Sequence, residues 1–111
     1  MRMSERRCAI TQEKALPVLE AAHIRPVADG GSHRLGNGLL LRSDVHTLFD
    51  RGYITVTPDH RVRVSRRLKA DFDNGEHYYQ LEGSPIWVPR SSEAQPRGDL
   101  LEWHADTVFR G

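Results

Sequence analysis

A chain of 111 residues is the size of one domain, and its 38% hydrophobic and 28% charged residues are ordinary for a globular protein. It has no apolar run long enough to cross a bilayer and no secretory signal, so we expect a cytoplasmic protein without a membrane partner. Cys8 is the only cysteine, which excludes an internal disulfide and a four-thiolate zinc site. The net charge of +1 does not by itself indicate nucleic-acid binding.

The first half of the chain predicts elements that alternate between apolar stretches and a glycine-rich loop. A helix-permissive segment at 12–15 comes first, followed by a short strand at 16–24. The loop at 26–38, a second apolar stretch at 39–41 and a short helix at 43–50 come next. His23 falls at the end of the strand. Ser43 or Asp44 is expected to cap the helix, and Gly52 to close its C-terminus.

The second half predicts a β-hairpin and a terminal helix, separated by irregular chain. We expect the hairpin at 53–57 with 62–65 and two extended pieces at 78–79 and 86–88. A loop at 91–98 and the helix at 99–109 follow. Basic residues gather at 1–7 and again at 61–69. Each cluster either contacts phosphates or forms a solvated basic edge, and charge alone does not decide between the two.

Two features in residues 20–50 point to chemistry. His23 carries an imidazole that can take a proton from water near neutral pH, although a lone histidine is more often held by a backbone carbonyl. His46 and Asp50 are four residues apart, so they share one helix face and can either hold a divalent cation together or form a surface pair.

Asn37 is a third candidate, flanked by two glycines. It is either a simple turn residue in a left-handed conformation or a side chain whose amide binds loop backbone. In the second case it holds the strand that bears His23 against the helix that bears His46. The order of the three residues along strand, loop and helix then places them around one small cleft.

His23, Asn37 and His46 resemble the H, N and H of the HNH endonucleases, whose core is the ββα-metal fold. The surrounding residues are similar to one bacterial subfamily, which supplies the nuclease end of modification-dependent restriction enzymes; they are residues 19–26, 29–31, 37–41 and 44–52. Later residues resemble that subfamily's further strands, at 72, 74–75, 78–79, 81–83 and 89, and its closing helix, at 101–104 and 108–109.

The resemblance implies a role for each matching residue. His23 is the general base that activates water, Asn37 orders the loop, and His46 binds one divalent ion. Many family members place a second ligand just before the catalytic histidine, where this chain has Ala22, which has no ligating atom. Others take it from one turn beyond the last histidine, so we expect Asp50 to be the second ligand. Asp44 is expected to face away.

The sequence therefore predicts an α+β domain with a ββα-metal (HNH) core, an additional β-hairpin and strands, and a C-terminal helix. We expect residues 1–7 to be a basic N-terminal extension and residues 8–111 to be the nuclease domain. The predicted activity is metal-dependent hydrolysis of DNA phosphodiesters in a restriction-type system, with one Mg²⁺, Mn²⁺, Ni²⁺ or Zn²⁺ ion. Arg25, Arg42 and Arg51 are expected to contact phosphates. A DNA-reading domain or subunit would supply specificity, and a homodimer would allow a double-strand break.

Two other functions remain open at this point. The domain is either active or an inactive nucleic-acid-binding module, because Ala22 replaces a common ligand. A small zinc-bound structural domain that uses several of the six histidines is the other alternative. The remaining histidines and both tryptophans are expected to be core or surface residues: His33, His60, His77, His104, Trp87 and Trp103.

Overall fold

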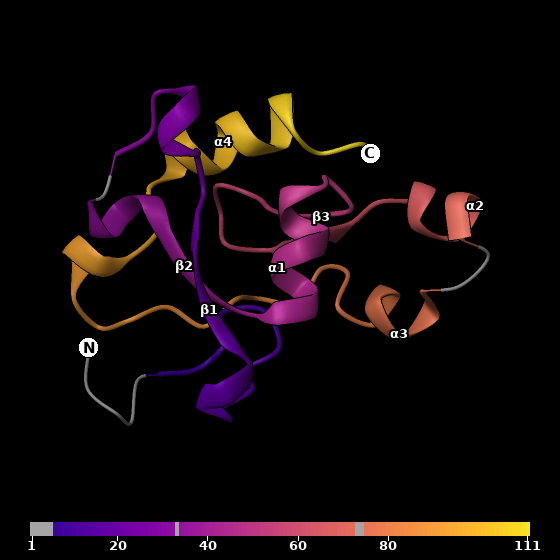
Figure 1. Cartoon of the computed structure of the whole chain (residues 1–111), viewed down its shortest axis with the longest axis horizontal. Coiled ribbons are helices and arrows are strands. Elements are labelled where there is room, and N and C mark those ends of the chain that lie inside the picture. The colour runs from indigo at the N-terminus through magenta and orange to yellow at the C-terminus, as the bar shows by residue number, and fades with distance from the viewer. Residues whose placement is uncertain (1–5, 33, 73–74) are drawn as a thin grey trace.

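The computed structural model describes residues 6–32, 34–72 and 75–111, and it is an α+β fold (Figure 1). Over these residues the strands and α-helices are β1 Leu19–His23, β2 Gly38–Arg42, α1 Ser43–Asp50, β3 Ile54–Val56, β4 Val62–Val64, α2 Arg67–Phe72, α3 Glu76–Tyr79 and α4 Gly98–Thr107. Short 3-10 turns, among them η3 (Val27–Asp29) and η4 (Leu35–Asn37), lie between them. His33, Asn74 and residues 1–5 of the expected basic extension lie outside the described residues.

The predicted ββα unit is present and forms the centre of the molecule. β1 pairs antiparallel with β2, from Leu19 opposite Arg42 to His23 opposite Gly38. The chain passes directly from β2 into α1, so the helix packs against the hairpin that precedes it. Val45 and Phe49, four residues apart on α1, are fully buried with Leu41 of β2. This core keeps the end of β1 at a fixed position relative to α1.

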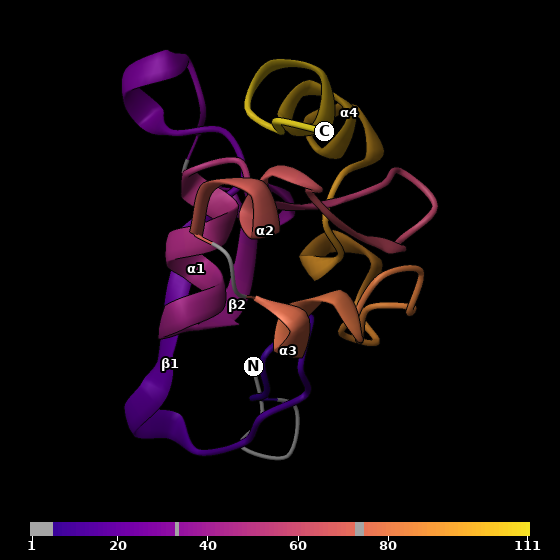
Figure 2. The ribbon, with the colours of Figure 1, turned by 90° about the vertical axis from the view of Figure 1, so that its right-hand side faces the viewer.

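The predicted hairpin is also confirmed. β3 pairs antiparallel with β4, and the period of two buries Val62 and Val64 while Arg63 between them stays exposed. α4 contacts β3 through its buried residues Leu101 and His104. Figures 1 and 2 show α4 across the end of the molecule to which both β1 and α1 lead. The ends of these three elements therefore lie close together.

The extended pieces expected at 78–79 and 86–88 are wrong. Tyr78 and Tyr79 end helix α3, because their hydroxyl groups bind distant partners, Asp44 and the Ser65 carbonyl. Around Ile86 the backbone donates to His60 and Ala9 in turn, and an isolated bridge joins Arg61 and Pro85, so no ladder forms. The described residues that resembled later strands of the subfamily therefore include the helices α2 and α3.

Two local expectations in the first half are also corrected. Residues 12–15 form no helix; Gln12 has a φ of 65°, and the Glu13 carboxylate accepts backbone N–H groups of the next two residues. Neither Ser43 nor Asp44 caps α1, whose N-cap is Arg42 without a side-chain hydrogen bond. Gly52 does close α1, with a φ of 83°. No helix in the described chain is long and apolar enough to span a membrane.

Candidate active site

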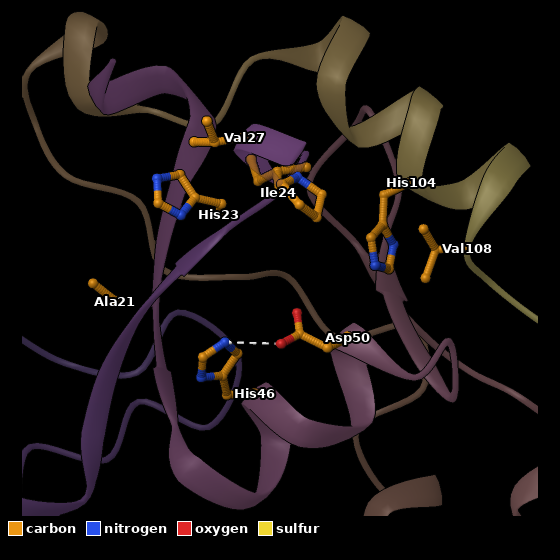
Figure 3. A pocket seen from close by; sticks show the side chains of 9 residues that line it. Ala21, His23, Ile24, Val27, His46, Asp50, His104 and Val108 are labelled. Carbon is orange, nitrogen blue, oxygen red and sulfur yellow. Dashed lines mark ion pairs between the residues drawn. The ribbon is translucent and has the colours of Figure 1, made fainter. Parts of the chain in front are cut away.

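An open cleft of about 530 Å³ lies where β1, α1 and α4 meet (Figure 3). Its lining residues are Ala21, His23, Ile24, Pro26, Val27, His46, Asp50, His104 and Val108. The structure thus brings together three of the predicted site residues, His23 from β1 and His46 and Asp50 from α1. Asn37 is not part of the lining and lies behind it.

His23 reaches this cleft because it is the last residue of β1. Successive side chains of a strand point to opposite faces. Ala22 is 3% exposed in the core, so its neighbour His23 is exposed and lines the cleft. The backbone ladder continues past His23, since the Ile24 N–H donates to the Asn37 carbonyl at 2.9 Å. The imidazole is therefore accessible to water while its backbone is held.

Asn37 is 1% exposed and uses its amide to bind loop backbone. Its Oδ1 accepts from the Arg25 N–H at 2.8 Å, and its Nδ2 donates to the carbonyls of Arg25 at 2.9 Å and Ser32 at 2.6 Å. It lies in the 3-10 turn η4 and not in the left-handed region. The expectation that its amide binds loop backbone is confirmed. It fixes the chain just beyond His23, and these side-chain bonds go to loop backbone and not to α1.

His46 and Asp50 face each other across one turn of α1, as their spacing predicted. His46 Nε2 lies 3.1 Å from Asp50 Oδ2, and the Asp50 side chain is 54% exposed. Partial burial raises the pKa of Asp50, and the Glu20 carboxylate adds to the rise while His46 opposes it. One imidazole and one carboxylate form a donor pair of the kind that holds divalent transition metals. Among the described residues, no group of three or more His, Cys, Asp or Glu side chains is arranged to hold a metal ion.

Glu20 is a site residue that the sequence analysis missed. Its Oε1 lies 2.8 Å from Nδ1 of His46, although the two residues are 26 positions apart. The signal was present in the strand pattern, because Glu20 and Ala22 are two residues apart and share one face of β1, on which Ala22 is buried. The Glu20 side chain is 51% exposed, and from this position it reaches His46 on the helix.

His104 was expected to be a packing residue, and it is 1% exposed. Its ring stacks on Phe49 with centroids 3.7 Å apart. Nε2 donates to the Phe49 carbonyl at 2.8 Å, which leaves Nδ1 to accept from the Thr55 hydroxyl at 2.7 Å. Burial lowers the pKa of His104 to about 4, so the ring is neutral at pH 7. It ties α4 to the end of α1 beside the cleft.

Comparison with known proteins explains this arrangement. Residues 8–57 match the HNH endonuclease family, and that range contains His23, Asn37, His46 and Asp50. This match covers a little under half of the chain. The match indicates a nuclease, and the part of the chain that carries it contains the ββα unit, which supplies His23, His46 and Asp50 to the cleft. Comparison with curated proteins gave no match.

One solved structure, a "Modification dependent TagI restriction endonuclease", shares the fold of this chain. The two are 21% identical with a TM-score of 0.67, over 96% of this chain and 34% of the other. The likeness therefore extends beyond residues 8–57 to almost the whole chain, including α4. This chain spans about a third of the length of that structure.

The arginines near the HNH motif differ in the contacts that their side chains make within the protein. Asp44 binds Arg42 through two bonds, at 2.7 and 3.0 Å, and also accepts from the Tyr78 hydroxyl. These bonds lower the pKa of Asp44 to about 2 and turn it away from His46, as expected. Arg25 lies over the Trp103 ring, 5.0 Å from its centroid. Arg51, just after α1, is exposed.

Proposed function

We propose that this chain is a metal-dependent endonuclease that hydrolyses phosphodiester bonds in DNA. The observation that supports it most is the meeting of His23 with the His46–Asp50 pair in one open cleft. The cleft is open to solvent, so a phosphate group can enter it. A base and a cation-binding pair on opposite sides of one bound phosphate are what phosphodiester hydrolysis requires.

His23 acts as the general base in this proposal. Its imidazole accepts a proton from water as the water oxygen forms a bond to phosphorus and the bond to the 3′ oxygen breaks; that oxygen takes a proton from solvent. Asn37 keeps the imidazole in place by holding the backbone of Arg25, two residues beyond His23. Its contribution is therefore one of orientation.

His46 and Asp50 would hold one divalent ion, and their imidazole–carboxylate set fits Mn²⁺, Ni²⁺ or Zn²⁺, with Mg²⁺ also tolerated. When bound, the ion would neutralise charge that develops on the phosphate. Ala22 offers no donor atom, so the protein contributes these two side chains.

DNA contacts would come from exposed cations at the edge of the motif. Arg51 is the best placed of the three predicted arginines, because the guanidinium of Arg42 is bound by Asp44 and Nε of Arg25 donates to the Asp29 carbonyl at 2.6 Å. A net charge of +1 provides a weak grip that fades with salt, and a phosphate site reads no sequence. We therefore assign recognition to a separate DNA-reading domain or subunit.

The proposed setting is the nuclease part of a restriction-type system in the cytoplasm. The name and the greater length of the similar structure support it, since a modification-dependent restriction enzyme needs a reader as well as a nuclease. We assign residues 8–111 to the nuclease domain and residues 1–7 to a basic extension. One site cuts one strand, so a double-strand break would require a dimer or two successive cuts.

A plasmid-nicking assay tests the proposal. The chain should nick supercoiled DNA with Mn²⁺ or Mg²⁺ and stop when a chelator is added. His23→Ala should lower the rate by about 10²–10⁴-fold, the usual contribution of a general base. His77→Ala, at an exposed histidine on α3, is the matched control and should nick like wild type. Equal nicking by His23→Ala, or DNA binding without any nicking, would contradict it. Unfolding on removal of a bound zinc would favour the structural alternative.

A further inference from the structure

His46 lies between two carboxylates, one at each nitrogen of its ring. Glu20 Oε1 is 2.8 Å from Nδ1, and Asp50 Oδ2 is 3.1 Å from Nε2. The two nitrogens of an imidazole direct their lone pairs or hydrogens to different sides of the ring. A cation that binds one nitrogen can therefore have only one of these carboxylates beside it. The other carboxylate must have a different role.

The cleft distinguishes the two. Asp50 lines it together with His23 and His46, whereas Glu20 is not among its lining residues. Figure 3 shows the His46 nitrogen that pairs with Asp50 on the cleft side of the ring. Glu20 instead approaches from the face of β1 that bears Ala22, against the body of α1. Nε2 is thus the nitrogen next to the space that a phosphate would enter.

We propose that Glu20 is a positioning residue, which accepts a hydrogen bond from Nδ1–H of His46 and so leaves the Nε2 lone pair free for a cation beside Asp50. This inference rests on the proposed metal dependence. A neutral imidazole carries one hydrogen, and the shorter contact, 2.8 Å to Glu20 at Nδ1 against 3.1 Å to Asp50 at Nε2, favours the hydrogen on Nδ1. A partner of this kind fixes the orientation of a metal-binding histidine and makes its other nitrogen a better donor.

The need for such a residue follows from the small donor set. With Ala22 in place of a ligating side chain, His46 and Asp50 are the side chains that hold the ion. A rotation of the His46 ring would then remove half of the donors at once. The contact with Glu20 restricts that rotation. Glu20 lies on β1, which pairs in register with β2, and β2 leads into α1.

Two measurements on the full chain test the role of Glu20, and neither depends on activity. The first is the affinity for Zn²⁺ alone, by titration calorimetry, in wild type, Glu20→Ala and Glu20→Gln. Glu20→Ala should weaken binding by about 10–100-fold, the usual effect of losing the partner of a ligand. Glu20→Gln keeps an acceptor oxygen for Nδ1–H and should lose less. Glu93→Gln, at an exposed residue of the turn Ser92–Ala94, is the control and should bind like wild type.

The second measurement is the tautomer of His46 in the metal-free protein, from ¹⁵N NMR at pH 8.5, with the signal assigned by its absence in His46→Gln. Wild type and Glu20→Gln should carry the hydrogen on Nδ1, and Glu20→Ala should shift it toward Nε2. Wild-type Zn²⁺ affinity and an unchanged tautomer in Glu20→Ala would overturn the proposal. So would equal losses in Glu20→Gln, Glu20→Ala and Asp50→Ala, because Glu20 would then be a ligand. If wild type bound neither Zn²⁺ nor Mn²⁺, the proposed metal dependence would fail, and the tautomer shift would still test Glu20.

Discussion

Acidification should destabilise this protein through His104, a residue that touches no substrate in the proposed reaction. The folded protein keeps this imidazole neutral, because the ring is 1% exposed and both of its nitrogens are already bonded. Burial lowers its pKa from 6.5 to about 4. In the unfolded chain the ring is in water and takes up a proton at the ordinary pKa. Protons therefore bind the unfolded state first as the pH falls.

The sign and size of the effect follow from these two pKa values. Above pH 6.5 both states are neutral at His104, and the contribution does not change with pH. Below 6.5 the unfolded state is favoured progressively, until the folded state also protonates near pH 4. For a fall from pH 8 to pH 5, the free energy of unfolding should decrease by about 2 kcal/mol from this residue alone.

Urea denaturation at 25 °C, followed by tryptophan fluorescence, measures this quantity at each pH. The comparison is with His104→Gln, which retains every other titratable group, so that subtraction of the two curves isolates the histidine. We expect the variant to be less stable at pH 8 and the gap between the proteins to narrow by about 2 kcal/mol at pH 5. A gap that stays constant across this range would refute the reasoning, since it would mean that His104 protonates equally in both states.

Three further substitutions test other contacts in the fold. Asn37→Ala should lower the free energy of unfolding by about 1–3 kcal/mol, because buried backbone groups lose their partners. Urea denaturation curves measure this loss. Reduced nicking with an unchanged denaturation curve would mean that the amide acts on substrate. Asp44→Ala should destabilise by about 1 kcal/mol at pH 7, a figure reduced for its 38% exposed side chain. That loss should vanish as the pH falls from 4 toward 2, because the pKa is low in the folded state, and Zn²⁺ affinity should stay the same. Gly52→Ala should destabilise by at least about 1–3 kcal/mol, since its φ is 83° and a Cβ would collide with the Val108 carbonyl; a melting temperature equal to wild type would contradict this.

Features that lie within one element were predictable from the sequence. The spacing of His46 and Asp50 on a helix places them on one face wherever that helix packs. Strand alternation likewise predicted that Val62 and Val64 share one face. His23 was placed at the end of the predicted first strand because the apolar stretch ends there. The HNH resemblance joined these local features into one predicted site, and the family match over residues 8–57 confirms the resemblance. The catalytic roles stay predictions for the nicking assay.

The failures came where distant residues meet. Aromatic and β-branched residues at 78–79 and 86–88 suit strands, but a residue's preference is weak against a specific partner. The Tyr78 hydroxyl donates a hydrogen bond to Asp44, which is 34 residues away, and Tyr78 lies in helix α3. No property of Tyr78 itself reveals which carboxylate will lie beside it.

The sequence by itself therefore determined the order of the ββα elements and the helix face that His46 and Asp50 share, because those depend on spacing along one chain segment. Tertiary structure decided which side chains surround them. Glu20 reaches His46 only because β1 pairs with β2 in one register and α1 follows β2 directly. His104 reaches Thr55 and Phe49, 49 and 55 positions away, only because α4 packs across β3 and the end of α1. Such pairs depend on how separate elements pack, and no spacing within either element encodes that distance.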